Sequence, residues 1–316
     1  MWNSKEIPDK IVVPMVSLAI ILVLFLLYWG SMKSVKTDSI VHPIAQEEKY
    51  NEEAFSGVKI SAKSAMVWDI KNHKAIYSYN PDLVLPLASL TKVMMAITAS
   101  DLVPAYTVVP IKKEFLAEEG DSGFKVDENW RLKDLLDFSL ITSSNDGARA
   151  IASVAGAISG GASTYDIGRK EFVDRMNEKA KKIGLDSMYF SNENGLDANA
   201  SLGGAYGNVR DVVKLFEYAL KTTPQIIEPT KKSSAVIKSI DNVDHVANNT
   251  NYEVNLIPGI IASKTGYTAL AGGNLAIVFD AELGRPMIIS VLGSTLEGRF
   301  TDVNTLIKAS REYLQQ

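Results

Sequence analysis

The sequence predicts an α/β fold of the α+β kind, in which strands from both ends of the folded region form one mixed sheet with a helical lobe inserted. Strand-like runs rich in β-branched and aromatic residues lie near the start, from Lys59 to Trp68 and from Ala75 to Tyr79. Similar runs return near the end of the chain, and the segment between them has helical periodicity. Strands on both sides of a helical middle favour a single sheet that the lobe interrupts.

The chain before residue 57 is predicted to hold a membrane anchor and a tether. Ile11 to Trp29 contains no charged residue, and a helix of ~20 apolar residues spans a bilayer core. Tyr28 and Trp29 end this run as interfacial aromatic residues do, and no A-x-A cleavage site follows. A retained transmembrane helix over residues 11–29 is therefore favoured over a cleaved signal peptide, with residues 30–56 as a polar linker.

The remaining elements follow from apolar periodicity and from start and stop signals. Three strands separated by glycine-containing turns are expected near the end, and Asn208 is expected to be the N-cap of a helix. The strands are Ile260–Thr265, Asn274–Phe279 and Pro286–Leu292. The helices are Leu90–Ala99, Leu132–Leu140, Asn145–Ile158, Tyr165–Ile183, Asn208–Lys221 and Asp302–Leu314.

Composition excludes several classes of function. The 316 residues are 46% hydrophobic, enough for one large domain or two lobes of one fold. The net charge of -4, with both signs interspersed, gives no basic field that would attract nucleic acid. Cysteine is absent and the three histidines, His42, His73 and His245, are scattered, so neither a metal nor another cofactor is expected. An activated serine in this chain needs a base other than histidine.

The spacing S-x-x-K places a hydroxyl and an amine on one face of a helix. Only at Ser89 and Lys92 does an apolar segment follow that predicts a helix buried nearly all round. Burial lowers a lysine pKa from ~10.4 toward the range in which the neutral amine can act as a base. A capping serine followed by a lysine that reaches solvent explains the segment as well. The other two copies are Ser56 with Lys59 and Ser122 with Lys125.

Two further segments carry groups suited to the same chemistry. Ser143 and Asn145 lie in a polar turn, where they could relay a proton and accept a hydrogen bond from a lysine, although helix capping explains either residue. The only K-T-G of the chain begins at Lys264 and lies in a predicted strand. Its lysine could be a second cation beside Lys92, and its glycine would let a ligand backbone lie close. An edge strand with a glycine bulge is the alternative.

In this order, and in a helix, a turn and a strand, the three segments resemble the motifs of the penicillin-interacting serine enzymes. Together with Asn194-Gly195-Leu196-Asp197 and Arg210-Asp211, they are most similar to the low-molecular-mass penicillin-binding proteins that are serine D-Ala-D-Ala carboxypeptidases. The resemblance implies a β-lactamase/DD-peptidase-like fold for residues 57–316, with a mainly antiparallel five-stranded sheet flanked by helices. One departure is Ser144, which stands where the family usually has glycine.

The resemblance also implies the role of each site residue. Ser89 is the expected acylated nucleophile and Lys92 its base, while Ser143 and Asn145 relay protons and hold the substrate amide. The backbone N–H groups of Ser89 and Tyr267 are the expected oxyanion hole. The expected substrate-binding residues are Lys264, Thr265, Gly266, Tyr267, Arg299 and Arg210, although a helix-surface ion pair also explains Arg210.

The function implied is that of a serine-type D-alanyl-D-alanine carboxypeptidase, which removes the terminal D-Ala of peptidoglycan stem peptides through an acyl-enzyme on Ser89. β-Lactam antibiotics are then expected covalent inhibitors. A substrate in the cell wall places the catalytic domain outside the cell membrane and residues 1–10 in the cytoplasm. A β-lactamase is the nearest alternative, but the chain has no E-x-x-L-N loop. A non-catalytic penicillin-binding or wall-binding protein is the other.

Overall fold

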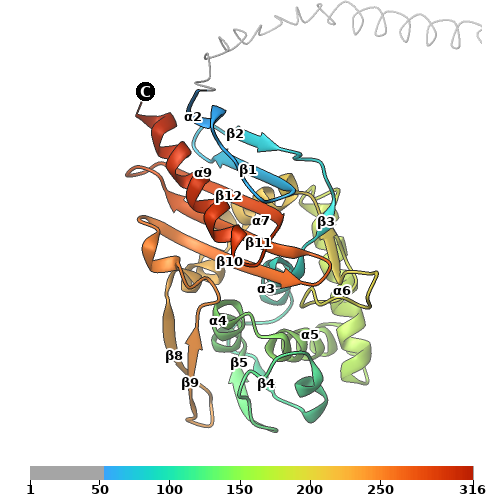
Figure 1. Cartoon of the computed structure of the whole chain (residues 1–316). Helices are drawn as coiled ribbons and strands as arrows, with labels where there is room; N and C mark the ends of the chain where they lie inside the picture. The colour runs from blue at the N-terminus through green and yellow to red at the C-terminus, as the bar shows by residue number, and fades with distance from the viewer. Residues whose placement is uncertain (1–52, 316) are drawn as a thin grey trace, which may run out of the picture. The chain divides into compact units, whose positions relative to one another are not determined.

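A computed structural model of the chain describes residues 53–315 (Figure 1). Its strands are β1 (Ser64–Asp69), β2 (Lys74–Tyr79), β3 (Leu85–Pro86), β4 (Val108–Pro110), β5 (Asn129–Arg131), β6 (Tyr189–Phe190), β7 (Ala205–Gly207), β8 (Ser234–Lys238), β9 (Asp244–Asn248), β10 (Ile260–Thr268), β11 (Gly272–Asp280) and β12 (Pro286–Ser294). Its α-helices are α2 (Glu53–Ser56), α3 (Thr91–Leu102), α4 (Leu132–Thr142), α5 (Asn145–Gly160), α6 (Tyr165–Lys182), α7 (Val209–Thr222), α8 (Pro224–Ile227) and α9 (Gly298–Leu314). Four 3₁₀ turns are η1 (Ala88–Leu90), η2 (Lys113–Ala117), η3 (Glu228–Lys231) and η4 (Val254–Leu256).

The central sheet joins strands from both ends of the described chain, as predicted. Its order is β10-β11-β12-β1-β2, and Ser64 of β1 lies opposite Leu292 of β12. The expectation of a mixed sheet is wrong, because all four neighbouring pairs are antiparallel. Connectivity explains three of these pairs, because short turns join β1 to β2, β10 to β11 and β11 to β12, whereas a parallel pair needs a long crossover. The fourth pair joins β1 to β12 from the other end of the described chain, and no local pattern in the sequence specifies its direction.

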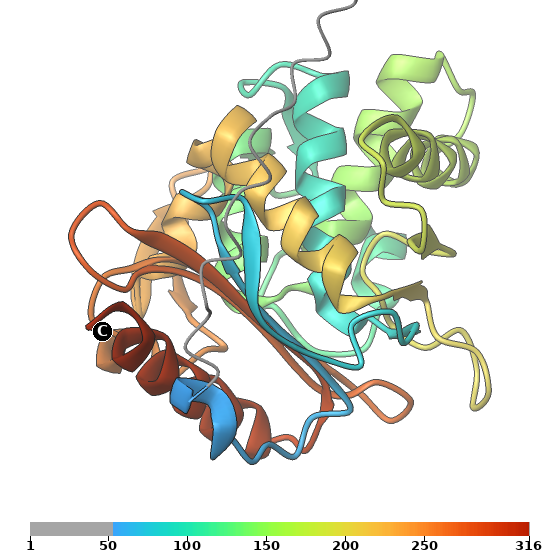
Figure 2. The ribbon, with the colours of Figure 1, turned by 90° about the horizontal axis from the view of Figure 1, so that it is seen from above.

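Helices cover both faces of this sheet. Figure 2 shows α9 and α2 on one face and α3 and α7, with the helical lobe, on the other. Successive strand residues point to opposite faces, so Met66 joins the large core with Met95 of α3, whereas Val67 joins the smaller core with Phe300 of α9. The sheet is therefore buried on both sides, which holds β10 rigidly where it meets the start of α3.

The predicted helices are present with ends shifted by a few residues, because local periodicity determines them. Asn208 caps α7 as expected, since its side chain accepts a hydrogen bond from the Asp211 N–H at 2.9 Å. The hairpin β8–β9 was not predicted from the sequence. Its strands alternate exposed and less exposed residues over only five positions each, which is a weak periodic signal.

The start of the domain differs from the predicted linker. Residues 53–56, assigned to the linker, form α2, and Phe55 stacks on Tyr77 of β2 with ring centroids 5.2 Å apart. Aromatic packing thus makes these residues part of the folded domain. The predicted membrane span, residues 11–29, lies outside the described residues. Between residues 53 and 315, no helix has both the length and the hydropathy needed to cross a bilayer.

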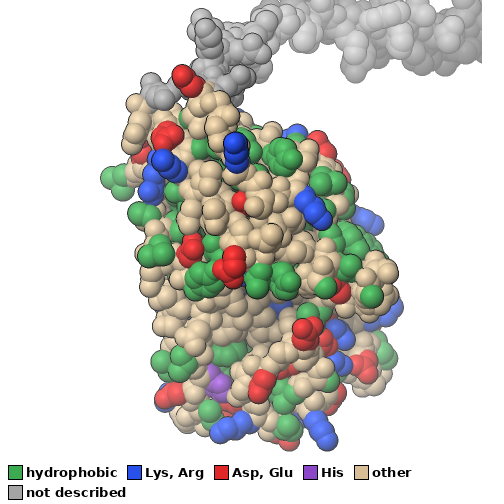
Figure 3. Space-filling model, in the orientation of Figure 1, with side chains coloured by type: hydrophobic (Ala, Val, Ile, Leu, Met, Phe, Trp, Pro, Cys, Tyr) green, Lys and Arg blue, Asp and Glu red, His purple; other side chains and the backbone are tan. Residues whose placement is uncertain are grey.

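The described surface carries both signs of charge. On the face drawn in Figure 3, Lys and Arg side chains are interspersed with Asp and Glu side chains. This matches the small net charge of -4 and leaves no extended basic area on that face for a nucleic acid backbone.

Candidate active site

Ser89 lies in η1, at the sharp turn that leads into α3. The residue before it, Ala88, has a left-handed backbone with φ of 48°, a conformation that costs a non-glycine residue about 1–2 kcal/mol. The surrounding structure holds this turn, because the Leu87 N–H donates to the Ala205 carbonyl at 2.9 Å. Backbone strain of this kind concentrates at functional positions, and here it aims the half-buried Ser89 side chain at Lys92.

Lys92 is fully buried one turn further along α3 and has three polar neighbours. Its Nζ lies 2.8 Å from Ser89 Oγ, 2.7 Å from Asn145 Oδ1 and 2.9 Å from the Asn194 carbonyl oxygen. The two carbonyl-type oxygens can only accept hydrogen bonds. A neutral amine has two N–H bonds and one lone pair, so both N–H bonds are used by these oxygens and the lone pair faces the Ser89 hydroxyl.

The orientation of the Asn145 amide supports this arrangement. Its Nδ2 donates to the Glu119 carbonyl oxygen at 2.7 Å, which leaves Oδ1 toward Lys92. Burial lowers the pKa of Lys92 to about 7, although the negative charges of Glu193 and Glu118 act in the opposite direction. Near neutral pH, a large fraction of the amine is therefore in the form that can take a proton from Ser89.

Ser143 and Lys264 form the second hydroxyl–amine pair of the site. Ser143 ends α4 with φ of 61°, and Lys264 Nζ donates to its Oγ at 2.8 Å and to the Thr265 carbonyl at 3.0 Å. Burial, together with the nearby charges of Lys92 and Arg299, holds the pKa of Lys264 well below its ordinary value. The site therefore contains two buried amines, each with a serine hydroxyl as neighbour.

Strand β10 brings the rest of the K-T-G segment beside Ser89. A Cβ on Gly266 would lie 3.1 Å from the Ser89 backbone nitrogen and 2.9 Å from the Leu87 carbonyl oxygen, so only glycine allows this approach. Thr265 Oγ1 lies 2.6 Å from Thr250 Oγ1, and Arg299 Nη1 donates to the Gly266 carbonyl at 2.9 Å.

Most of the predicted site residues therefore meet in one place. The residues brought together are Ser89, Lys92, Ser143, Asn145, Lys264, Thr265, Gly266 and Arg299, with the half-exposed Tyr267 next along β10. Arg210 is not among them: its Nε donates to Asp82 at 2.7 Å in a surface pair whose side chains are 44% and 74% exposed. Ser56, from the first copy of S-x-x-K, is an exposed residue of α2 whose Oγ donates to the Glu53 carbonyl.

Two backbone carbonyl groups belong to the site and were not predicted from the sequence. The Asn194 carbonyl accepts from Lys92, and the Glu119 carbonyl orients the Asn145 amide. The glycine that follows Asn194 was the one indication in the sequence of a special backbone position here: Gly195 has a left-handed backbone with φ of 82°. A Cβ there would lie 2.0 Å from the Ala88 carbonyl oxygen, so the loop can pack against η1 only with glycine at this position.

Ser144, the departure from the family pattern, has a structural role. Its Oγ accepts from the Gly147 N–H at 2.9 Å as the N-cap of α5, and it lies 2.6 Å from Ser122 Oγ. Ser122, from the third copy of S-x-x-K, thus connects its loop to the start of α5 through Ser144. The same loop carries Glu119, whose carbonyl accepts a hydrogen bond from the Asn145 amide.

We expect Ser144→Ala to lower the free energy of unfolding by about 1 kcal/mol, because the N-terminus of α5 loses its capping oxygen. Urea denaturation followed by circular dichroism measures this difference. Ser122→Ala is the matched control, since it removes the hydroxyl contact but keeps the cap, and it should have a smaller effect. An equal loss in both variants would contradict the capping role.

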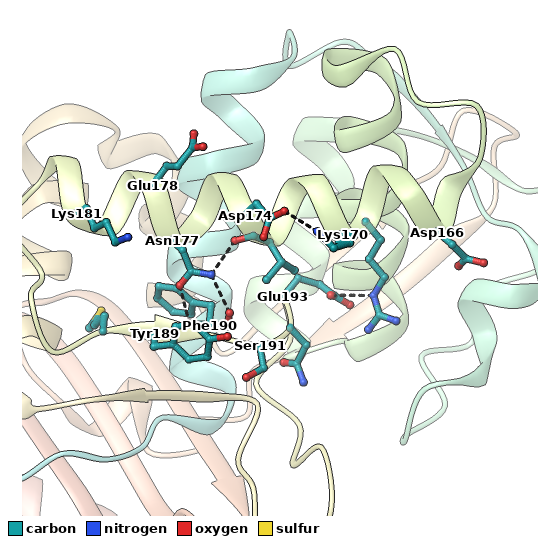
Figure 4. Close-up of a pocket in the computed structure, with 14 residues that line it drawn as sticks. Asp166, Lys170, Asp174, Asn177, Glu178, Lys181, Tyr189, Phe190, Ser191 and Glu193 are labelled. Atoms are coloured by element: carbon teal, nitrogen blue, oxygen red, sulfur yellow. Dashed lines mark hydrogen bonds and ion pairs between the residues drawn. The ribbon is translucent and has the colours of Figure 1, made fainter.

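A groove of about 790 Å³ lies between α6 and residues 188–193 (Figure 4). None of the predicted site residues lines it. Its wall includes the ion pair of Arg169 and Glu193, and Glu193 directly precedes Asn194, whose carbonyl contacts Lys92.

A serine hydroxyl facing the lone pair of a buried lysine, beside a strand with a second buried lysine, characterises a serine hydrolase that works through an acyl-enzyme. The fold and the order of the motifs are those of the penicillin-interacting serine enzymes, which include both DD-peptidases and β-lactamases. Residues 48–295 match the family model of peptidase S11, D-alanyl-D-alanine carboxypeptidase. The chain belongs to this family.

Known relatives agree with this assignment. A D-alanyl-D-alanine endopeptidase of Pseudomonas aeruginosa is 30% identical over 221 residues, which cover 68% of this chain and 66% of that protein, just under two thirds of its length. A D-alanyl-D-alanine carboxypeptidase of Mycobacterium tuberculosis is 28% identical over 239 residues, which cover 75% of this chain and 77% of that protein. The crystal structure of penicillin-binding protein D2 from Listeria monocytogenes with ampicillin bound has a TM-score of 0.66 and 26% identity, and covers 79% of this chain and 97% of that one.

Proposed function

We propose that this protein is a serine-type D-alanyl-D-alanine carboxypeptidase that removes the terminal D-Ala of peptidoglycan stem peptides. The observation that carries the proposal is the position of the buried Lys92 Nζ, 2.8 Å from Ser89 Oγ and within 2.9 Å of two carbonyl oxygens, which in the neutral amine directs the lone pair at Ser89. Membership of the family and the carboxypeptidase of Mycobacterium tuberculosis support the substrate class.

In the acylation step, Ser89 Oγ attacks the carbonyl carbon between the last two D-Ala residues, and Lys92 takes the hydroxyl proton. An ester bond forms, the amide C–N bond breaks, and the proton held by Lys92 passes through Ser143 to the leaving D-Ala amine, which returns Lys92 to its neutral form. Water then cleaves the ester, giving the shortened peptide its carboxylate and returning a proton to Ser89. The backbone N–H groups of Ser89 and Tyr267 are proposed to stabilise the oxyanion in both steps.

The other residues position the substrate in this proposal. Asn145 holds the Lys92 amine and the substrate amide, while Lys264 and Thr265 receive the terminal carboxylate. Arg299 acts through β10, because it holds the Gly266 carbonyl and adds positive charge near that carboxylate. Arg210 has no role in the proposed reaction, since its partner is Asp82 on the surface.

Endopeptidase activity on cross-linked peptides is a second candidate, favoured by the relative from Pseudomonas aeruginosa with that name. Both activities use the same acyl-enzyme and differ in the amine that leaves. Incubation with a cross-linked dimer of stem peptides distinguishes them, because only endopeptidase activity yields two monomers.

We expect the full-length protein in detergent to release D-alanine from a peptide ending in D-Ala-D-Ala and to be labelled by a fluorescent penicillin. Ser89→Ala should abolish both signals, because Ser89 supplies the hydroxyl that hydrogen bonds to Lys92 among the residues that the structure describes. Ser56→Ala is the matched control and should keep both, since this serine is exposed and its Oγ donates to the Glu53 carbonyl. No D-alanine release by the wild type would contradict the proposal, and labelling without release would indicate a non-catalytic penicillin-binding protein.

We further propose that residues 11–29 anchor the protein in the cell membrane as a single span, with the catalytic domain on the outer side. The uncharged run from Ile11 to Trp29 supports the span, and a substrate in the cell wall supports the orientation. The Listeria penicillin-binding protein with bound ampicillin supports β-lactams as covalent inhibitors. Retention in the membrane pellet after alkaline extraction, with the domain open to added protease in spheroplasts, tests the anchor.

A further inference from the structure

A buried ion pair lies directly behind the loop that contacts the catalytic lysine. Glu193 has a side chain that is 0% exposed, and Arg169 of α6 donates through Nε to its Oε2 at 2.9 Å (Figure 4). Removing a carboxylate from water is unfavourable, and pairing offsets this only when both of its oxygens are satisfied. Glu193 Oε1 has no hydrogen-bond partner among the described residues, so the fold retains this pair at an energetic cost that hydrophobic packing alone does not require.

A second carboxylate extends this pair into a network. Glu118 lies 2.8 Å from Arg149 of α5 and 3.5 Å from Arg169. Asn194 Nδ2 donates to Glu118 at 3.1 Å. Two acids and two arginines therefore form one network, and Glu118 joins it to the side chain of Asn194.

Asn194 connects this network to the active site, because its backbone carbonyl is one of the two oxygens that hold the Lys92 amine. Its neighbour in the chain is Glu193. The two carboxylates raise the pKa of Lys92 against the larger lowering effect of burial. Besides the two arginines, the other charged or titratable groups that face this region among the described residues are Lys264 of β10, Arg299 of α9, Asp146 of α5, Asp166 of α6 and Asp121.

We propose that Glu193 and Arg169 are positioning residues for the catalytic amine: they hold the Asn194 carbonyl against Lys92, and their opposite charges balance its protonation. The carboxylate favours the ammonium form of Lys92 and the guanidinium favours the neutral form. This inference rests on the proposed function only in that Lys92 is the base that activates Ser89. It assigns neither residue a contact with substrate.

The test is the pH dependence of the rate constant for acylation of the full-length protein by a fluorescent penicillin. In the wild type this rate constant should rise with pH through about 7, as Lys92 loses its proton. Glu193→Gln removes one of the two carboxylates that favour the ammonium form of Lys92 and leaves Glu118, 3.5 Å away, as the partner of Arg169, so the midpoint should move down by about one pH unit. Arg169→Gln leaves the carboxylate unopposed, so the midpoint should move up by about one pH unit.

Opposite shifts distinguish electrostatic balance from a merely structural role. Arg169→Lys keeps the charge and should restore the wild-type midpoint, and the double variant Glu193→Gln with Arg169→Gln should lie near it. Arg175→Gln is the matched control, because this arginine of the same helix pairs with Glu178 on the surface. Thermal unfolding checks that each variant folds, and Glu118→Gln replaces Glu193→Gln if that variant does not, with the same downward shift expected.

Unchanged midpoints, or shifts in the same direction, would overturn the inference while leaving the proposed function intact. A wild type that penicillin does not acylate would instead contradict the proposed function. The two failures are therefore separable in one set of measurements.

Discussion

Lys92→Gln is expected to slow acylation of Ser89 by about 10²–10⁴-fold, the range that a positioned general base contributes. Glutamine is similar in length and can hydrogen bond to Ser89, but its amide has no lone pair basic enough to take the hydroxyl proton. The Asn145 and Asn194 oxygens that hold the amine would also lose one of their donors. The second-order rate constant for labelling by a fluorescent penicillin measures the effect.

The matched control for this variant is Lys125→Gln. Lys125 belongs to another S-x-x-K copy, but its side chain is exposed and its serine contacts Ser144 instead. Acylation should remain at the wild-type rate. Less than a tenfold loss in Lys92→Gln would contradict the role of Lys92 as the base, as would a residual rate in that variant that still rises through pH 7.

Gly195→Ala is expected to lower the free energy of unfolding by about 2–5 kcal/mol, the sum of left-handed strain and overpacking. The new methyl group would lie 2.0 Å from the carbonyl oxygen of Ala88 and 2.5 Å from its carbonyl carbon, both backbone atoms that cannot rotate away. Either η1 or the Asn194 carbonyl must then move. Because these groups set the distance from Ser89 to Lys92, acylation should also fall by at least about tenfold.

Gly184→Ala is the control that separates the effect of left-handed backbone strain from the effect of the close contact with Ala88. Gly184 has φ of 73°, close to the 82° of Gly195, but nothing lies within 4 Å of its ideal Cβ position. Strain alone predicts a loss of about 1–2 kcal/mol and no change in the acylation rate constant. Chemical denaturation and penicillin labelling of both variants provide the comparison, and equal effects would show that the contact with Ala88 is unimportant.

Much of the architecture could be predicted because helices and strands depend on residues close in the chain. The apolar run after Ser89 indicated a buried helix, and in α3 every residue from Thr91 to Ala99 is buried, with Lys92 among them. That same context separated Ser89 from Ser56 and Ser122. Sheet direction was predicted less well: the local pattern of a strand does not specify its partner, and the expected mixed sheet is antiparallel throughout.

The resemblance to the family predicted the role of Arg210 poorly, because this side chain has a partner outside the site. Arg210 lies on α7, as the helical pattern predicts, but Asp82 lies close enough to pair with it at the surface. No feature of the sequence near Arg210 indicates this contact, because the two residues are far apart in the chain.

The sequence by itself determined the order of the elements, the buried helix that carries Lys92 and the strand that carries Lys264. Only the tertiary structure decided which atoms complete the site. Lys92 meets a backbone carbonyl 102 residues away and Lys264 meets a hydroxyl 121 residues away, distances over which no periodic pattern extends. The direction of the Lys92 lone pair follows from such contacts, because a carbonyl oxygen is common to all residues and becomes distinctive only through its place in the fold.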